Sequence, residues 1–173
     1  MDRLLPTLII ALVIAGVFAL MLLGWRNRGR RQAGLARPVP APESLGAASL
    51  VVAGWYVATT RADEPLERIS VHGLGFRARA SAAVHSEGLV LAVRGQQPFL
   101  IPTTALRGAG RATWAIDRVV ERDGLVLIGW LLGDTPVDSY LRLPDPIDAA
   151  ALVAAVQALT LGSAIDPAKG ISS

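Results

Sequence analysis

The sequence predicts a mainly β domain that is preceded by one transmembrane helix and ends in one α-helix. Three observations predict this class. An apolar run without charged residues extends from Leu4 to Trp25, short apolar or alternating runs separated by Gly, Pro and Asp fill the middle of the chain, and residues 145–162 show helical spacing. A length of 173 residues suits one domain in addition to a membrane segment.

The apolar run is long enough to cross a membrane, because about 20 residues at a rise of 1.5 Å cover a hydrocarbon core of roughly 30 Å. Little positive charge precedes the run, whereas four arginines follow it within six residues: Arg26, Arg28, Arg30 and Arg31. A cleavable signal peptide would show the opposite order of charge. Positive charge is retained on the cytoplasmic side of membranes. We therefore expect residues 1–26 to span the plasma membrane once, with the N-terminus outside and the C-terminal domain in the cytoplasm.

Residues 27–45 are expected to form a basic juxtamembrane linker. Pro38, Pro40 and Pro42 alternate there among Arg, Gly and Ala, a composition that favours an extended chain without a packed core. The arginines around this linker explain the pI of 10.2, since the chain from Gly46 onward holds 11 basic and 12 acidic residues. A nucleic-acid-binding domain carries positive charge on its own surface, so we expect no nucleic-acid partner.

Residues 46–162 are expected to contain an antiparallel β domain, because hairpin-type turns such as Glu87-Gly88 and Asp123-Gly124 separate the apolar runs. The pattern predicts seven strands, at residues 49–60, 76–85, 89–94, 99–102, 112–120, 125–132 and 139–143. The short glycine-containing segment 108–111 is interpreted as a turn. Trp55, Trp114 and Trp130 lie in the predicted strands and are expected to pack in the core.

A helix is expected after the last strand, over residues 145–162. Asp145 suits the N-cap, and Pro146 suits the first helical position. Apolar residues recur at helical spacing from Leu152 onward, so the helix should bury one face on the β domain and cover an open end of it. Residues 163–173 are expected to form a flexible tail.

Three segments of the chain carry a resemblance to a known family: Trp55-Tyr56-Val57-Ala58-Thr59-Thr60, Pro65-Leu66-Glu67-Arg68-Ile69 and His72-Gly73-Leu74-Gly75-Phe76-Arg77. They resemble small actinobacterial single-pass membrane proteins with a bacterial pleckstrin-homology-like (PH-like) domain. The resemblance covers nearly the whole chain and implies a seven-stranded antiparallel PH-like sandwich or barrel capped by the C-terminal helix. The chain departs from inositol-lipid-binding PH domains, because basic residues are missing around the Glu87-Gly88 turn.

The sequence offers no catalytic set. Cysteine is absent, and His72 and His85 are the only imidazoles, with no evident partner for general base chemistry near either of them in sequence. Three acidic residues crowd positions 63–67, but they lack EF-hand spacing and arginines flank them, which favours a solvated, salt-bridged loop. We therefore expect a protein that is not an enzyme and that uses no cofactor and no metal.

Two surfaces are candidates for binding. The juxtamembrane Arg26, Arg28, Arg30 and Arg31 are suited to anionic lipid headgroups. The segment between positions 59 and 79 is the candidate surface for a protein partner, because loops on a rigid β scaffold are the usual binding surface. Its charged members are Arg61, Arg68, His72, Arg77 and Arg79. We expect a membrane-anchored, non-catalytic scaffold module that acts on an unknown protein partner at the cytoplasmic face. The alternative is a peripheral lipid-binding or envelope-homeostasis factor that uses the juxtamembrane arginines.

Overall fold

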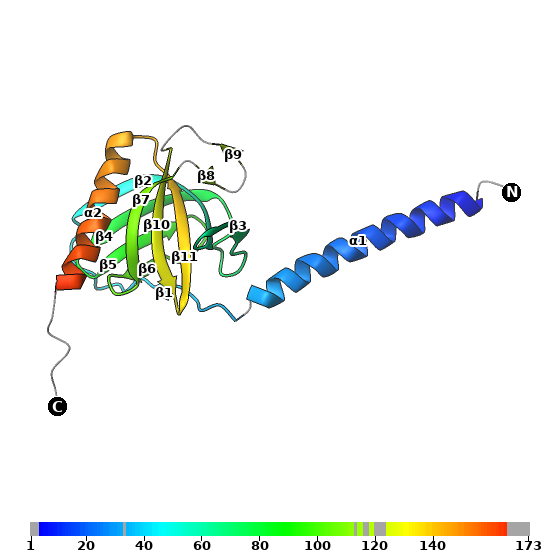
Figure 1. Ribbon diagram of the computed structural model, residues 1–173, viewed down its shortest axis with the longest axis horizontal. Helices are drawn as coiled ribbons and strands as arrows, with labels where there is room; N and C mark the ends of the chain where they lie inside the picture. The colour runs from blue at the N-terminus through cyan, green and yellow to red at the C-terminus, as the bar shows by residue number, and fades with distance from the viewer. Residues whose placement is uncertain (1–3, 33, 113, 116–117, 120–123, 166–173) are drawn as a thin grey trace, which may run out of the picture. The chain divides into compact units, whose positions relative to one another are not determined.

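The computed structural model describes residues 4–32, 34–112, 114–115, 118–119 and 124–165. The chain divides into two compact units, of which the first ends at Gly34 and the second begins at Leu35. The first unit is a helix, and the second is an antiparallel β structure with a C-terminal helix (Figure 1). The expected class, a mainly β protein with one helix at each end, is confirmed.

Helix α1 (Leu4–Gln32) has 29 residues and is about 43 Å long at 1.5 Å per residue. Its segment Thr7–Gly24 has a mean hydropathy of 2.8 and is fully exposed, so the helix is long and apolar enough to cross a membrane. N-terminal signal sequences share this length and composition. The helix continues to Gln32, so residues 27–32, expected in the extended linker, are helical. The four arginines and Gln32 are good helix formers and favour the extension, although Asn27 and Gly29 between them do not.

Nine strands form one antiparallel sheet among the residues that the structure describes. They are β1 (Val39–Pro40), β2 (Leu50–Arg61), β3 (Glu64–Arg68), β4 (Ala78–His85), β5 (Gly88–Val93), β6 (Phe99–Pro102), β7 (Leu106–Ala112), β10 (Leu125–Leu132) and β11 (Thr135–Arg142). The sheet order is β1-β6-β5-β4-β2-β11-β10-β7, and β3 pairs with β2. Among the described residues, strand β8 (Trp114–Ala115) pairs with β9 (Arg118–Val119) in a separate two-stranded sheet.

Six of the seven predicted strands correspond to β2, β4, β5, β6, β10 and β11, and the described residues of the seventh, predicted at 112–120, belong to the end of β7, to β8 and to β9. The strand beside β10 is β7, which contains the segment 108–111 that was interpreted as a turn. Gly108 pairs with Gly129 across this ladder, and a ladder needs only backbone N–H and C=O groups. Residues 113, 116, 117 and 120 lie outside the described part of the chain.

Two short strands were not predicted, because neither shows an apolar alternation. Strand β1 lies in the expected linker and pairs Val39 with Leu100 at the edge of the sheet, where a proline such as Pro40 is tolerated. Strand β3 pairs with the end of β2, and its residues from Glu64 to Glu67 are all exposed. Without a buried face, such a strand leaves no hydrophobic signal in the sequence.

The core lies between the inner faces of the curled sheet and helix α2 (Pro146–Ile165). Helix α2 packs mainly on β7 and also reaches β2, β4 and β10 (Figure 1). It buries Leu152 and Val156 completely. Asp145 caps it as predicted, since its Oδ1 accepts a hydrogen bond from the Ile147 N–H at 2.7 Å. The helix runs to Ile165, so residues 163–165 of the expected tail are helical, and residues 166–173 lie outside the described part.

The predicted burial of the tryptophans holds for Trp130 and is wrong for Trp55. Trp130 is 2% exposed and stacks near Phe99, with ring centroids 6.1 Å apart. Trp55 is half-buried on the outer face of β2, because its neighbour Tyr56 points into the core and successive side chains of a strand point to opposite faces. The side chain of Trp114 lies outside the described part.

A chain of buried hydrogen bonds crosses the core beside β2. The Tyr56 hydroxyl donates to the Leu74 carbonyl at 2.9 Å and lies 2.5 Å from Thr59 Oγ1. Thr59 Oγ1 is 2.6 Å from Ser139 Oγ, which also accepts a hydrogen bond from Trp130 Nε1 at 2.9 Å. Burial raises the pKa of Tyr56 far above its ordinary value. These bonds tie the segment after β3 to the core.

Candidate functional site

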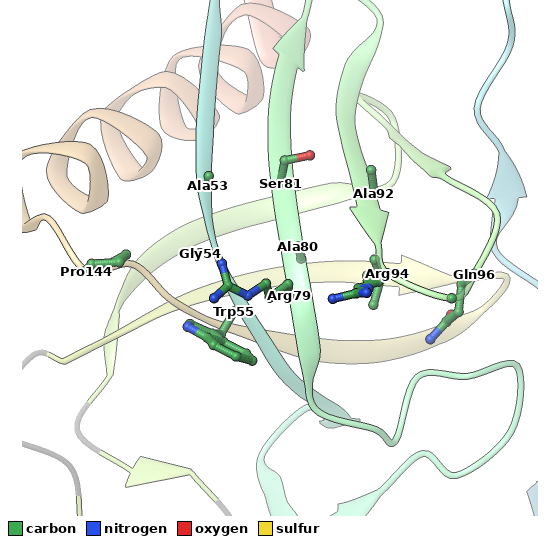
Figure 2. A pocket seen from close by; sticks show the side chains of 12 residues that line it. Ala53, Gly54, Trp55, Arg79, Ala80, Ser81, Ala92, Arg94, Gln96 and Pro144 are labelled. Carbon is green, nitrogen blue, oxygen red and sulfur yellow. The ribbon is translucent and has the colours of Figure 1, made fainter.

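The outer face of β2, β4 and β5 contains a hollow of about 510 Å³ (Figure 2). Ala53 on β2, Ser81 on β4 and Ala92 on β5 pair with one another across the sheet. All three side chains are small and lie on the outer face, so this row leaves space above the strands. The hollow is therefore a consequence of three small residues that meet only through strand pairing.

The hollow is also lined by Trp55, Arg79 and Arg94, each two residues away in the chain from one of the small residues, and further arginines lie beside them. Trp55 pairs with Arg79 on β4 and with Arg142 on β11, so the three side chains share the outer face. Arg94 follows β5 directly, and its N–H donates to the Arg79 carbonyl at 2.9 Å. Figure 2 shows the Arg79 and Arg94 side chains at the same end of the hollow. We call Trp55, Arg77, Arg79, Arg94 and Arg142 the arginine row.

Two guanidinium groups of the row lie over the same indole ring. The Cζ atoms of Arg77 and Arg79 are 5.3 Å and 5.1 Å from the centroid of Trp55. A cation over an indole face gains roughly 0.5 to 1 kcal/mol at an exposed site. The indole thus holds two positive charges close together.

No carboxylate among the described residues forms an ion pair with the arginine row. Arg77, Arg79, Arg94 and Arg142 have no such partner within 4.0 Å, although the row brings four positive charges onto one face. Like charges at short distance repel, so this arrangement costs free energy in the unliganded protein. The site therefore suits an anion.

Gly54 allows the chain to close one side of the hollow. A Cβ atom at this position would lie 2.5 Å from the Arg142 carbonyl oxygen and 2.6 Å from Cδ2 of Leu143. The segment that leaves β11 therefore crosses directly over Gly54 and places Pro144 at the rim. Only glycine fits this crossing.

A second hollow, of about 410 Å³, lies between the segment before β2 and the loop that follows β3. His72 and Arg37 contribute to its wall. His72 has a positive φ of 56°, and its Nε2–H donates to the Leu35 carbonyl at 3.0 Å. Gln96 borders both hollows, and its Nε2 donates to the Gly73 carbonyl at 2.8 Å.

A family model described as "Bacterial PH domain-like" matches residues 35–157. The matched range includes the whole nine-stranded sheet and more than half of α2. The chain belongs to the bacterial PH domain-like family. No curated protein matches the chain at a significant level. The resemblance to a bacterial PH-like domain is thus confirmed for the second unit.

The PH-like domain does not bring the predicted partner-surface residues together. Arg77 and Arg79 belong to the arginine row, whereas His72 lies in the second hollow. The other two have local roles. Arg61 Nε lies 3.7 Å from Glu67 Oε1, and Arg68 Nη1 donates to the Gly75 carbonyl at 3.3 Å. Residues adjacent in sequence are therefore divided among three places on the domain.

Sequence reasoning missed three members of the site: Trp55, Arg94 and Arg142. Trp55 was assigned to the core, and the two arginines stood alone in their strands. The alternation of the Trp55-Tyr56 pair requires one of the two rings to point outward, and this was the available signal. Nothing in the sequence showed that Arg94 and Arg142 would lie beside it, because that depends on strand register.

The remaining predicted groups have no shared site. The backbone of Arg26, Arg28, Arg30 and Arg31 lies in α1, and their side chains are outside the described part. The segment expected as an acidic loop is largely strand β3, in which a hydrogen bond with Glu67 raises the pKa of Glu64 and Arg61 partly opposes this. Groups of three or more metal-ligating side chains are not found among the described residues. His85 Nδ1 lies 2.8 Å from the Gly46 carbonyl oxygen, to which it donates.

Proposed function

We propose that this protein is a membrane-anchored, non-catalytic PH-like module that recruits a protein partner at the cytoplasmic face of the plasma membrane. The observation that carries the proposal is the helix α1, whose apolar, fully exposed segment Thr7–Gly24 runs directly into four arginines on the same helix. An apolar surface of this size is stable only in lipid or against a partner. The basic flank favours retention of the C-terminal side in the cytoplasm.

The hydrogen bonds made by the two histidines favour a binding role over catalysis. Both histidines donate to backbone carbonyls, those of Leu35 and Gly46, so one ring nitrogen of each is used in a structural hydrogen bond. PH-like domains are generally non-catalytic binding modules, and the match of residues 35–157 to this family supports such a role. The arginine row, which forms no ion pair with a described carboxylate, is a surface suited to binding an anion.

Reporter fusions test the anchor and its direction. Green fluorescent protein and alkaline phosphatase are fused in turn to the C-terminus, and we expect fluorescence, no phosphatase activity and full-length protein in the membrane fraction. The matched control moves the four arginines in front of Leu4, which should reverse both reporters. A shortened, soluble chain that begins after α1 would identify a signal sequence and would contradict the proposal.

Cross-linking in intact membranes tests the partner. We expect at least one protein to be recovered reproducibly with the full-length chain and to be absent when α1 alone is expressed. Recovery of only abundant membrane proteins, at the level found with α1 alone, would count against a recruiting role. This outcome is independent of the topology result.

A second candidate function is the binding of anionic lipid headgroups by Arg26, Arg28, Arg30 and Arg31. The observation that favours it is the continuation of α1 to Gln32, which keeps these positions within about 9 Å of Trp25 along the helix axis, close to the depth of the headgroup layer. Each arginine would gain about 1 kcal/mol from an anionic leaflet. A variant with four glutamines should lose co-purified anionic lipid while its topology is unchanged. Unchanged lipid retention in this variant would reject the peripheral lipid-binding or envelope-homeostasis role.

A further inference from the structure

The strongest unexplained feature of the domain is the positive charge of the arginine row. Arg142 and Arg79 lie on β11 and β4, Arg94 directly follows β5, and Trp55 of β2 lies between the first two. Four adjacent strands separated by about 4.8 Å spread these charges over roughly 14 Å. Solvent and salt screen the charge repulsion along the row in part, and a ligand of opposite sign relieves it further.

The indole ring presents the guanidinium groups in a form suited to carboxylates. A guanidinium that lies over an aromatic ring uses its flat face for the contact and keeps its N–H edge available. The N–H edge is the part that binds a carboxylate with two parallel hydrogen bonds. Arg77 and Arg79 both lie over Trp55 and are therefore ordered before a ligand arrives. Ordering in advance lowers the entropy lost on binding.

The shape of the site distinguishes between a flat and a narrow ligand. The hollow is lined by the small side chains of Ala53, Ser81 and Ala92, with the larger Trp55 and Pro144 beside them (Figure 2). A bilayer surface is flat on this scale and would touch the rim without entering. An extended polypeptide enters such a recess, and a length of about 14 Å corresponds to roughly four residues at 3.3 Å each. A single small anion would contact one end of the row and leave the other arginines unpaired.

We infer that the hollow beside the arginine row binds an extended acidic segment of a protein partner. The segment carries at least two Asp or Glu side chains, which meet Arg79, Arg94 and Arg142, and a small apolar side chain between them, which lies on Ala53 and Ala92. The inference rests on the proposed function, since it names the chemistry of the partner that the membrane-anchored domain recruits. The bonds formed are charge-assisted hydrogen bonds on a partly apolar floor.

Peptide binding to the full-length protein tests this inference. The protein is placed in phosphatidylcholine nanodiscs, which carry no net charge, and titrated into a fluorescein-labelled peptide in which Glu alternates with Ala. We expect saturable binding that weakens at least tenfold between about 50 mM and 500 mM salt, because screening lengths fall over this range. The same peptide with Gln in place of Glu should not bind.

Matched variants locate the binding. Arg94→Gln should weaken peptide binding about tenfold, and the double variant Arg79→Gln with Arg94→Gln about a hundredfold, as expected for lost charge-assisted bonds. Arg107→Gln removes the same charge from the exposed side of β7 and should change the affinity less than twofold. Circular dichroism on heating checks that all variants are folded. Equal weakening by Arg94→Gln and Arg107→Gln would show a non-specific effect of net charge and would overturn the inference.

Phosphate-bearing ligands test the alternative that the hollow binds a phosphate group or a lipid headgroup. Inorganic phosphate, inositol hexakisphosphate and nanodiscs with phosphatidylserine are compared with the acidic peptide on the same variants. Preferential, Arg79-dependent binding of any of these, with no binding of the peptide, would overturn the inference in favour of a phosphate or lipid ligand. Absence of binding by every probe would overturn it as well.

The two proposals fail in different ways. If the cross-linked partner is recovered equally well with the Arg79→Gln and Arg94→Gln double variant, the recruiting function stands and the arginine row is not its site. If the peptide binds through the row but the reporters place the domain outside the cell, the binding site stands and the cytoplasmic function fails.

Discussion

Trp55 and Tyr56 are neighbours in β2, and the polar groups around them are arranged in opposite ways on the two faces of the sheet. On the inner face, the Tyr56 hydroxyl belongs to a continuous chain of hydrogen bonds that ends on the Leu74 carbonyl. On the outer face, the guanidinium groups around Trp55 form no ion pair with a carboxylate of the described residues. The inner arrangement stabilises one conformation of the domain. The outer arrangement leaves guanidinium groups with which a ligand can form hydrogen bonds.

The largest effect is expected from truncating each ring in turn. Tyr56→Ala should lower the free energy of unfolding by about 3 to 5 kcal/mol, because it removes a fully buried ring and interrupts the hydrogen-bond chain. Trp55→Ala should lower the free energy of unfolding by about 1 kcal/mol, since the ring is only half-buried and the contacts of the two guanidinium groups with it contribute little. Urea unfolding of both variants measures the difference. Equal losses would contradict the division of roles between the faces.

Gly54→Ala is expected to have the next largest effect, because the new methyl group meets the Arg142 carbonyl and the Leu143 side chain. Overpacking of this kind costs up to about 3 kcal/mol. Gly110→Ala is the matched control, since a Cβ atom there has no neighbour within 4 Å. Thermal unfolding of the two variants should differ by several degrees. A stable Gly54→Ala protein would show that the crossing over β2 is loose.

Ser139→Ala tests the inner face with the removal of a single oxygen. The Trp130 Nε1–H loses its acceptor, and Thr59 loses a hydrogen-bond partner, in a region closed to water. We expect a loss of about 2 kcal/mol. Urea unfolding measures it, and peptide binding to the outer face should be unaffected. A coupled loss of peptide affinity would show that the two faces do not act separately.

The smallest effect is expected at Asp138, whose pKa is raised by partial burial and by the nearby Asp63. The folded state binds this proton more tightly than the unfolded chain, so the carboxyl lowers stability increasingly as pH rises through both pKa values. Asp138→Asn should therefore gain a few tenths of a kcal/mol at pH 7, the solvent-screened size of such an effect, and almost nothing at about pH 3. Urea unfolding at both pH values measures it. A larger gain at low pH would reverse the sign of this interpretation.

The parts of the fold that follow local rules were predictable from the sequence. Asp145 and Pro146 marked the start of α2, and alternation marked β2, β4 and β10. Strand β7 was not predictable in this way, because its glycines show a turn composition and only pairing with β10 makes them a strand. A short exposed strand such as β3 carries no burial pattern at all.

The candidate site was less predictable than the fold, and the reason is register. Trp55, Arg79, Arg94 and Arg142 are far apart in the chain, and each is unremarkable in its own strand. They meet because Trp55 pairs with both Arg79 and Arg142. Conversely, Arg61 and His72 looked like one surface because they are close in sequence, and the turn between β3 and β4 separates them. Nearness in sequence is a poor guide to nearness on a sheet.

The hydrogen-bond chain inside the core has only one arrangement of its protons. The Leu74 carbonyl can only accept, so the single hydroxyl proton of Tyr56 is used there, and Thr59 must donate to Tyr56. Ser139 must then donate to Thr59, and Trp130 donates to Ser139. Every donor points the same way, from β10 through β11 and β2 to the segment after β3. The hydroxyl protons of Thr59 and Ser139 should therefore exchange slowly with water, and this fixed polarity selects one rotamer at each position.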